Sequence, residues 1–318
     1  MPNLPYVYQV TKYDPADRDD QGRYVGAEVT TSDHGPQESA YLSAVTSFAA
    51  ESGVTELTVR DPHIPAFVSF GLEPPIEGHG LAGLFAPDLS DYFDGAVVSI
   101  EVGLALVRAM LRDHGAWCQL EVEDRFCVQV GYDQYLYIGS TTYCERALEV
   151  TMQAGLFPVR IDRSPYDDLD DDGPAQPADD AFWAEVASLA EGHGAVLLAE
   201  HFVRNGVRWH RVEPGHLHAV RRQLAPRAIV EIWPDCSTDF DTVRAQAALM
   251  ELGCELIWVD RTGAIHTERV EEAAGLVIPG EAVGALVVSS TSDGYCPLAQ
   301  AVLPDADGVL RARWVPFS

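Results

Sequence analysis

One segment of this chain contains almost nothing that it could bury. Residues 163–180 read RSPYDDLDDDGPAQPADD, with seven aspartates and three prolines, and Tyr166 and Leu169 are the large apolar side chains. The burial of so few apolar side chains cannot offset the conformational entropy that is lost when a segment becomes ordered. The segment therefore predicts an acidic linker between two domains, residues 1–162 and 181–318, both of ordinary domain length.

The flanking patterns predict an α+β fold class, with a mostly antiparallel sheet and helices packed on one side in each domain. In the first domain, helical spacing follows Gly35 and spans 96–114, and two alternating strands flank the turn at 123–124. In the second domain, Asn205-Gly206 predicts a hairpin turn. Further strands are expected there, the last of them at 310–315.

The negative charge of the chain argues against nucleic acid as a partner and favours a basic protein. The sequence has 49 acidic and 21 basic residues, for a net charge of −28, and residues 1–160 alone carry −14 (23 acidic, 9 basic). Nucleic-acid binding depends on Lys and Arg at phosphates, so direct binding of nucleic acid is not expected. The same field attracts a basic protein and speeds its association. High charge also keeps a protein soluble without any partner, which is the simpler interpretation.

The sequence predicts a cytoplasmic protein without membrane contact. Residues 1–5 lack the basic and apolar regions of a secretory leader, and there is no apolar run of about 18 residues. No catalytic signature is present, and neither a cofactor nor a metal ion is expected.

A tyrosine-rich strand is the main candidate for partner binding. In GYDQYLYIGS (131–140), alternation places Leu136 and Ile138 on the core side and leaves Tyr135 and Tyr137 on the other side, either exposed or packed under a loop. Tyrosine is a frequent anchor of protein interfaces, although ordinary packing in the sheet is the alternative. The predicted partner-binding residues are Glu121, Glu123, Asp133, Tyr135 and Tyr137.

Two other groups of residues suggest different functions. An arginine-rich patch for RNA would have to come from Arg204, Arg208, Arg211, Arg221 and Arg222. An unrecognised hydrolase would use the histidines of the second domain, which are His193, His201, His210, His216 and His218. Zinc requires such side chains to converge, but an expected helix at 216–224 would separate the last two.

Two segments carry a family resemblance. YQVTKYDPADRD (Tyr8–Asp19) and GYDQYLYIGS (Gly131–Ser140) resemble an uncharacterised actinobacterial family that is often labelled RNA-binding protein. The resemblance covers about the first 165 residues and extends less clearly into the second half, and it implies an association with RNA or with RNA machinery. It supplies no catalytic residues.

The expected function is therefore a non-enzymatic acidic binding protein. More specifically, we expect an immunity protein or inhibitor that neutralises a basic, nuclease-type protein. Its carboxylates could occupy the positions at which a nuclease binds the phosphates of its substrate. An RNA-associated protein and a hydrolase using the His193–His218 cluster are the alternatives.

Overall fold

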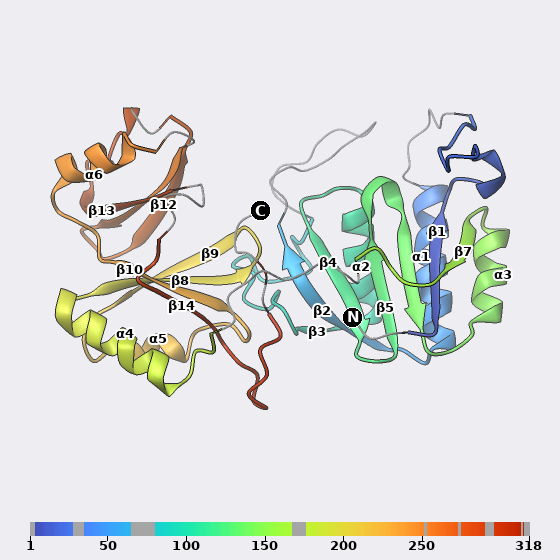
Figure 1. Cartoon of the computed structure of the whole chain (residues 1–318), viewed down its shortest axis with the longest axis horizontal. Coiled ribbons are helices and arrows are strands. Elements are labelled where there is room, and N and C mark those ends of the chain that lie inside the picture. The colour runs from blue at the N-terminus through green and yellow to red at the C-terminus, as the bar shows by residue number, and fades with distance from the viewer. Residues whose placement is uncertain are drawn as a thin grey trace. The chain divides into compact units, whose positions relative to one another are not determined.

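The structure is a computed structural model, and it divides into two units (Figure 1). Unit 1 comprises Met1–Asp172, Val203–Gly206 and Trp314–Ser318, and unit 2 comprises Gly173–Phe202 and Val207–Arg313. None of the described helices is long and apolar enough to cross a membrane. The structure describes residues 4–27, 35–64, 80–166, 176–250, 253–272, 275–289, 296–312 and 314.

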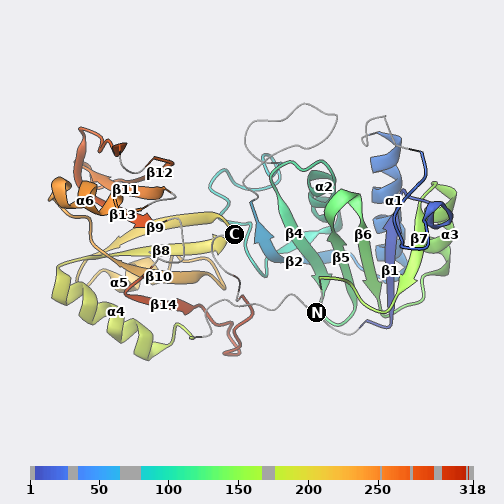
Figure 2. The same cartoon turned by 45° about the horizontal axis from the view of Figure 1, so that its top comes forward.

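The described residues of unit 1 form an antiparallel sheet of seven strands in the order β3-β2-β4-β5-β6-β1-β7, with three helices on one face (Figures 1 and 2). The fold class predicted from the sequence is confirmed. The strands are β1 (Tyr6–Thr11), β2 (Glu56–His63), β3 (Val97–Ser99), β4 (Trp117–Val122), β5 (Phe126–Val130), β6 (Leu136–Ser140) and β7 (Phe157–Ile161). The helices are α1 (Pro36–Glu51), α2 (Ile100–Leu111) and α3 (Glu145–Gln153), with short 3-10 turns η1 (Pro15–Asp17) and η2 (Tyr132–Gln134).

The core of unit 1 lies between the helices and the sheet. Phe48 of α1 is fully buried, and its ring centroid lies 5.6 Å from that of Tyr8 on β1. On α2, a Cβ added to Gly103 would lie 2.6 Å from Cδ1 of Leu57. The glycine therefore lets α2 approach the sheet more closely than a larger residue would.

The helix that the sequence predicts at 96–114 begins later in the structure. Val97 and Val98 extend the sheet as part of β3, and Ser99 then caps α2 by accepting a hydrogen bond from the backbone N–H of Val102 (3.4 Å). The β-branched valines favour the strand, and the serine supplies the start of the helix. The last predicted strand is wrong, because described residues 310–312 and 314 form no strand.

The described residues of unit 2 form two antiparallel sheets and three helices. One sheet has the order β14-β10-β8-β9 and the other β12-β11-β13. The first consists of β8 (Val196–Val203), β9 (Gly206–Val212), β10 (Ile229–Pro234) and β14 (Ala299–Val302), and the second of β11 (Cys254–Asp260), β12 (Ile265–Val270) and β13 (Ala282–Ser289). The helices are α4 (Asp180–His193), α5 (Leu217–Arg221) and α6 (Phe240–Ala247).

These elements form layers because alternate strand residues bury opposite faces of one sheet. Leu198 of β8 packs against α4, whereas its neighbour Leu197 packs against the second sheet at Ile257. Val243 of α6 covers the other face of that second sheet. Strand β8 therefore packs apolar side chains on both of its faces around Leu197 and Leu198, and it is buried along its whole length.

The two ends of the predicted linker are ordered. Ser164 is buried and donates a hydrogen bond to Oε1 of Gln129 (2.5 Å). At the other end, Ala178 donates from its backbone N–H to the carbonyl of Val302 (2.8 Å), beside β14. Residues 167–175, which hold five of the seven aspartates, lie outside the described residues.

A buried carboxylate joins α1 to α2. The side chain of Glu38 is 8% exposed and accepts hydrogen bonds from Arg108 Nε (3.1 Å) and from both Nε and an NH2 group of Arg112. Burial alone raises the pKa of Glu38, but the hydrogen bond and charge of Arg112, with the charge of Arg108, bring the pKa below its ordinary value of 4.5. The ionised form is therefore the stabilising one.

We expect Glu38→Gln to lower the free energy of unfolding at pH 7 by about 1–2 kcal/mol, since both arginines are partly exposed and can turn to water. Because the pKa of Glu38 is lowered on folding, its contribution is complete above pH 4.5 and is lost as the pH falls below that value. Urea unfolding at pH 7 and pH 3 should show a difference from the wild type that shrinks at pH 3. Glu149→Gln, at an exposed position of α3, is the control. A difference that stays constant with pH would contradict this account.

Candidate protein-binding site

The two segments that carry the family resemblance lie side by side. Strand β1 pairs antiparallel with β6, with Gln9 opposite Tyr137 and Val10 opposite Leu136. Beyond the paired residues, the chain continues into residues 12–27, called here the aspartate loop, while residues 131–135 before β6 form the tip turn. The pairing therefore places these two polar segments next to each other.

The tip turn has an unusual backbone. Asp133 and Gln134 are successive residues with φ of 55° and 58°, a region that costs non-glycine residues about 1–2 kcal/mol each. The turn is held by a hydrogen bond from the N–H of Gly131 to the carbonyl of Tyr135 (2.7 Å), and by one from Nε2 of Gln134 to the carbonyl of Leu111 (3.1 Å). This backbone leaves the side chain of Tyr132 85% exposed.

The aspartate loop is an ordered structure with its own hydrogen bonds. Asp14 caps η1 by accepting from the N–H of Ala16 (2.9 Å). Asp19 accepts from the N–H groups of Gln21 and Arg23 (2.9 Å each) and pairs with the Arg23 guanidinium at 2.8 Å. Its own side chains therefore fix the course of the loop.

Tyrosines join the aspartate loop to the tip turn. The ring of Tyr13 lies 4.8 Å from that of Tyr24 and 6.0 Å from that of Tyr135. The hydroxyl of Tyr13 donates to Oδ1 of Asp133 (3.0 Å). Arg18 donates to the hydroxyl of Tyr135 (2.5 Å), and its guanidinium lies 5.9 Å from the centre of that ring. The arrangement is an aromatic cluster surrounded by aspartates.

Of the five predicted partner-binding residues, Asp133 and Tyr135 are brought together here. Tyr137 is only 8% exposed, so of the two arrangements expected for it, exposure or packing under a loop, the structure has the second. Tyr166 covers it, with ring centroids 5.7 Å apart, and the preceding Ser164 is bonded to β5. Alternation along the strand was correct for Leu136 and Ile138, but it could not show that residues 164–166 return over the other face.

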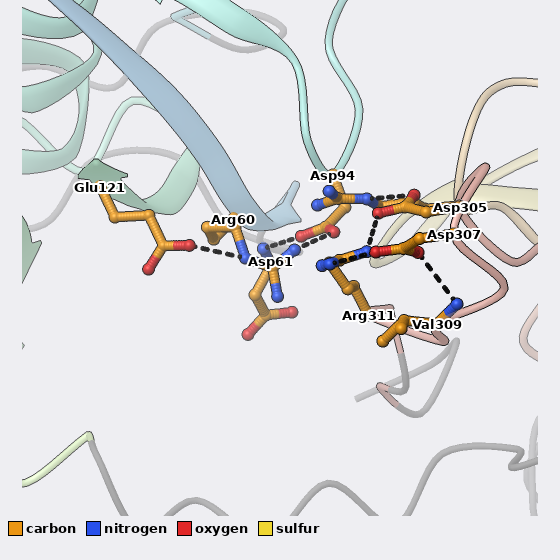
Figure 3. A network of polar contacts seen from close by, with 9 residues as sticks. Arg60, Asp61, Asp94, Glu121, Asp305, Asp307, Val309 and Arg311 are labelled. Atoms are coloured by element: carbon orange, nitrogen blue, oxygen red, sulfur yellow. Dashed lines mark hydrogen bonds and ion pairs between the residues drawn. The ribbon is translucent and has the colours of Figure 1, made fainter. Parts of the chain in front are cut away.

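Glu121 lies in a separate ion network on β4 (Figure 3). Arg60 Nε contacts Glu121 (3.1 Å), while another guanidinium nitrogen contacts Asp94 (2.5 Å). Asp94 also accepts from the backbone N–H of Asp61 (2.7 Å), which has a φ of 46° at an irregularity of β2. Burial raises the pKa of Glu121, and Arg60 partly offsets this effect. Glu121 is therefore a mostly buried partner of Arg60 in this network.

Glu123 is exposed, but it lies away from the tip turn. It precedes the turn that joins β4 to β5, whereas the tip turn joins β5 to β6. Because β5 runs from one turn to the other, the two sites lie at opposite ends of that strand. The five predicted residues do not form one surface.

Most arginines of the predicted patch form ion pairs with carboxylates or lie over an aromatic ring. Arg204 pairs with Asp61 (2.8 Å), and Arg208 contacts Glu200 (3.4 Å), which is fully buried. Arg311, which is not a member of the predicted set, contacts Asp305 and Asp307. Figure 3 also draws this network of unit 2.

The remaining members of the predicted patch are also mostly engaged. Arg211 donates twice to Asp235, at 2.9 and 2.7 Å. The guanidinium of Arg221 lies 4.7 Å from the centre of the Trp183 ring. Arg222 is exposed. Charges paired in this way attract phosphate less strongly than isolated arginines do.

The histidines of unit 2 do not converge. His201 is buried and contacts Glu231 (3.1 Å), whereas His210 contacts Glu200 (2.8 Å). Glu200 and His201 are successive residues of β8 and face opposite sides of the sheet, so the two histidines are separated. Within the described part of the chain, no group of three or more His, Cys, Asp or Glu side chains could hold a metal ion. The other three are exposed, namely His193, His216 and His218.

Comparison with known proteins gives no relative: no family model, curated protein or solved structure matches this chain. Sequence reasoning missed Tyr13, Arg18, Tyr24 and Tyr132. Tyr13 and Arg18 lie in the segment YQVTKYDPADRD, Tyr24 lies five residues after its end, and Tyr132 lies in GYDQYLYIGS. Most of these residues therefore lie in the two segments that the sequence singles out. The contact between the segments depends on the pairing of β1 with β6, which no local pattern in the sequence predicts.

The strain in the tip turn can be measured at Gln134. Gln134→Ala and Gln134→Gly both lose the bond to Leu111, but only glycine adopts a positive φ without strain. We expect the glycine variant to be more stable than the alanine variant by about 0.5–1 kcal/mol in urea unfolding. At Glu149, within α3, the order should reverse, because alanine is preferred in a helix. The same order at both positions would contradict the positive φ of Gln134.

Proposed function

We propose that this chain is a non-enzymatic acidic binding protein whose tip turn and aspartate loop engage a basic protein. A nuclease-type partner that the chain neutralises is the form we favour, and the proposed setting is the cytoplasm. The observation that carries the proposal is the strained tip turn, which holds Tyr132 in water beside the exposed carboxylate of Asp133.

The cost of this backbone supports a role in binding. Positive φ at two successive non-glycine residues persists when surrounding contacts enforce it, and such strain is concentrated at functional sites. An exposed tyrosine brings a large contact area and has few rotatable bonds to fix. The surrounding carboxylates would steer a basic protein towards it.

The charge around the arginines favours this proposal over RNA binding. Four of the five candidate arginines contact a carboxylate or a tryptophan ring, within a chain of net charge −28. The separated histidines likewise give less support to a metal-dependent hydrolase.

The test uses an immobilised chain and a panel of purified basic nucleases, with basic proteins that lack nuclease activity as comparators. We expect the wild type to bind and inhibit a nuclease at low ionic strength. The double variant Tyr132→Ser/Asp133→Asn should weaken binding about tenfold or more, as expected for an interface anchor. Asparagine keeps an acceptor for Tyr13 and tolerates a positive φ.

The matched control is Tyr143→Ser/Glu149→Gln, which removes one exposed tyrosine and one exposed carboxylate near α3. It should bind like the wild type. Equal losses in the two double variants, or no binding of any basic protein at low ionic strength, would overturn the proposal.

A further inference from the structure

We infer that the tip turn and the aspartate loop recognise arginine side chains of the partner. The guanidinium would stack on a tyrosine ring, and its positive charge would be balanced by the carboxylate of Asp133. This inference rests on the proposed function and names the chemistry of its partner. The surface would prefer arginine-rich segments to lysine-rich ones.

Tyr132 and Asp133 provide the open part of this surface. The ring of Tyr132 is 85% exposed. Oδ1 of the neighbouring Asp133 accepts from Tyr13, while the residue itself is exposed. A carboxylate beside an accessible ring suits a planar guanidinium, which can stack on the ring and donate to the oxygen at the same time. Lysine, a compact and strongly hydrated cation, makes this combination less well.

The chain already shows this type of contact within the same cluster. Arg18 donates to the hydroxyl of Tyr135 at 2.5 Å, lies 5.9 Å from the centre of its ring, and donates to the carbonyl of Gly22 at 2.7 Å. The aromatic cluster can therefore accommodate a guanidinium. Arg18 also covers part of Tyr135 that a partner arginine would otherwise reach.

The local charge is complementary to such a segment. The aspartate loop and the tip turn contain five acidic and three basic residues, a net charge of −2. Arg23 is paired with Asp19, while Asp17, Asp20 and Asp133 are exposed. An arginine-rich segment would thus meet carboxylates around the tyrosine rings.

The experiment measures the binding of labelled oligo-arginine and oligo-lysine peptides of equal length to the full chain by fluorescence anisotropy at low ionic strength. We expect oligo-arginine to bind about fivefold more tightly. Tyr132→Leu should remove most of this preference, whereas Tyr132→Phe, which keeps a ring, should retain it. Circular dichroism checks that each variant is folded.

A second comparison removes one positive charge in two ways. Arg18→Gln uncovers Tyr135, whereas Arg23→Gln removes the same charge from an arginine that pairs with Asp19. We expect Arg18→Gln to bind oligo-arginine several-fold more tightly than Arg23→Gln does. Equal gains would show that charge alone is responsible and would overturn the inference.

The outcomes separate this inference from the proposed function. If both peptides bind equally well and neither depends on Tyr132, the inference is wrong, while charge-driven binding of a basic partner stands. If neither peptide binds at low ionic strength, the proposed function fails as well.

Discussion

The pairing of β1 with β6 determines what unit 1 can present at its surface. It places the N-terminal strand between β6 and β7, so that segments about 120 residues apart in the sequence leave the sheet together. The aspartate loop follows one strand and the tip turn precedes the other. The hydrogen bond from Tyr13 to Asp133 and that from Arg18 to Tyr135 both depend on this register. A shift by one residue would turn the side chains to the other face and separate these groups.

Buried carboxylates explain why the arginine and histidine candidates serve other roles. Glu200 and Glu231 are fully buried on strands β8 and β10, and a buried charge is costly unless it is paired and hydrogen-bonded. Arg208 and His210 contact the first of these carboxylates, and His201 contacts the second. Residues that seem available for RNA or a metal ion in the sequence thus stabilise the interior of unit 2.

How far the sequence predicts this structure depends on the range of the interaction. Local signals were sufficient for the α+β class, for α1 and for the β4–β5 hairpin, because these follow from periodicity and turn residues. Local patterns also showed that Leu136 and Ile138 face the core. They could not show that Tyr166 covers Tyr137, because that contact requires the chain to return over the sheet. Asp133 and Tyr135 could be proposed together because they lie in one segment, whereas the contact of Tyr13 with both depends on the pairing of β1 with β6.

The tip turn connects local strain to the binding role that we propose. Its two positive-φ residues cost free energy, yet Gly131, Tyr135 and Leu111 supply hydrogen bonds that keep the turn in place. A partner would therefore meet Tyr132 and Asp133 already oriented, and less conformational entropy would be lost on binding. A relaxed turn would place the same residues at the surface but would require them to be ordered by each partner. The strained backbone thus supports the proposal that this surface is already ordered before it binds a cationic side chain.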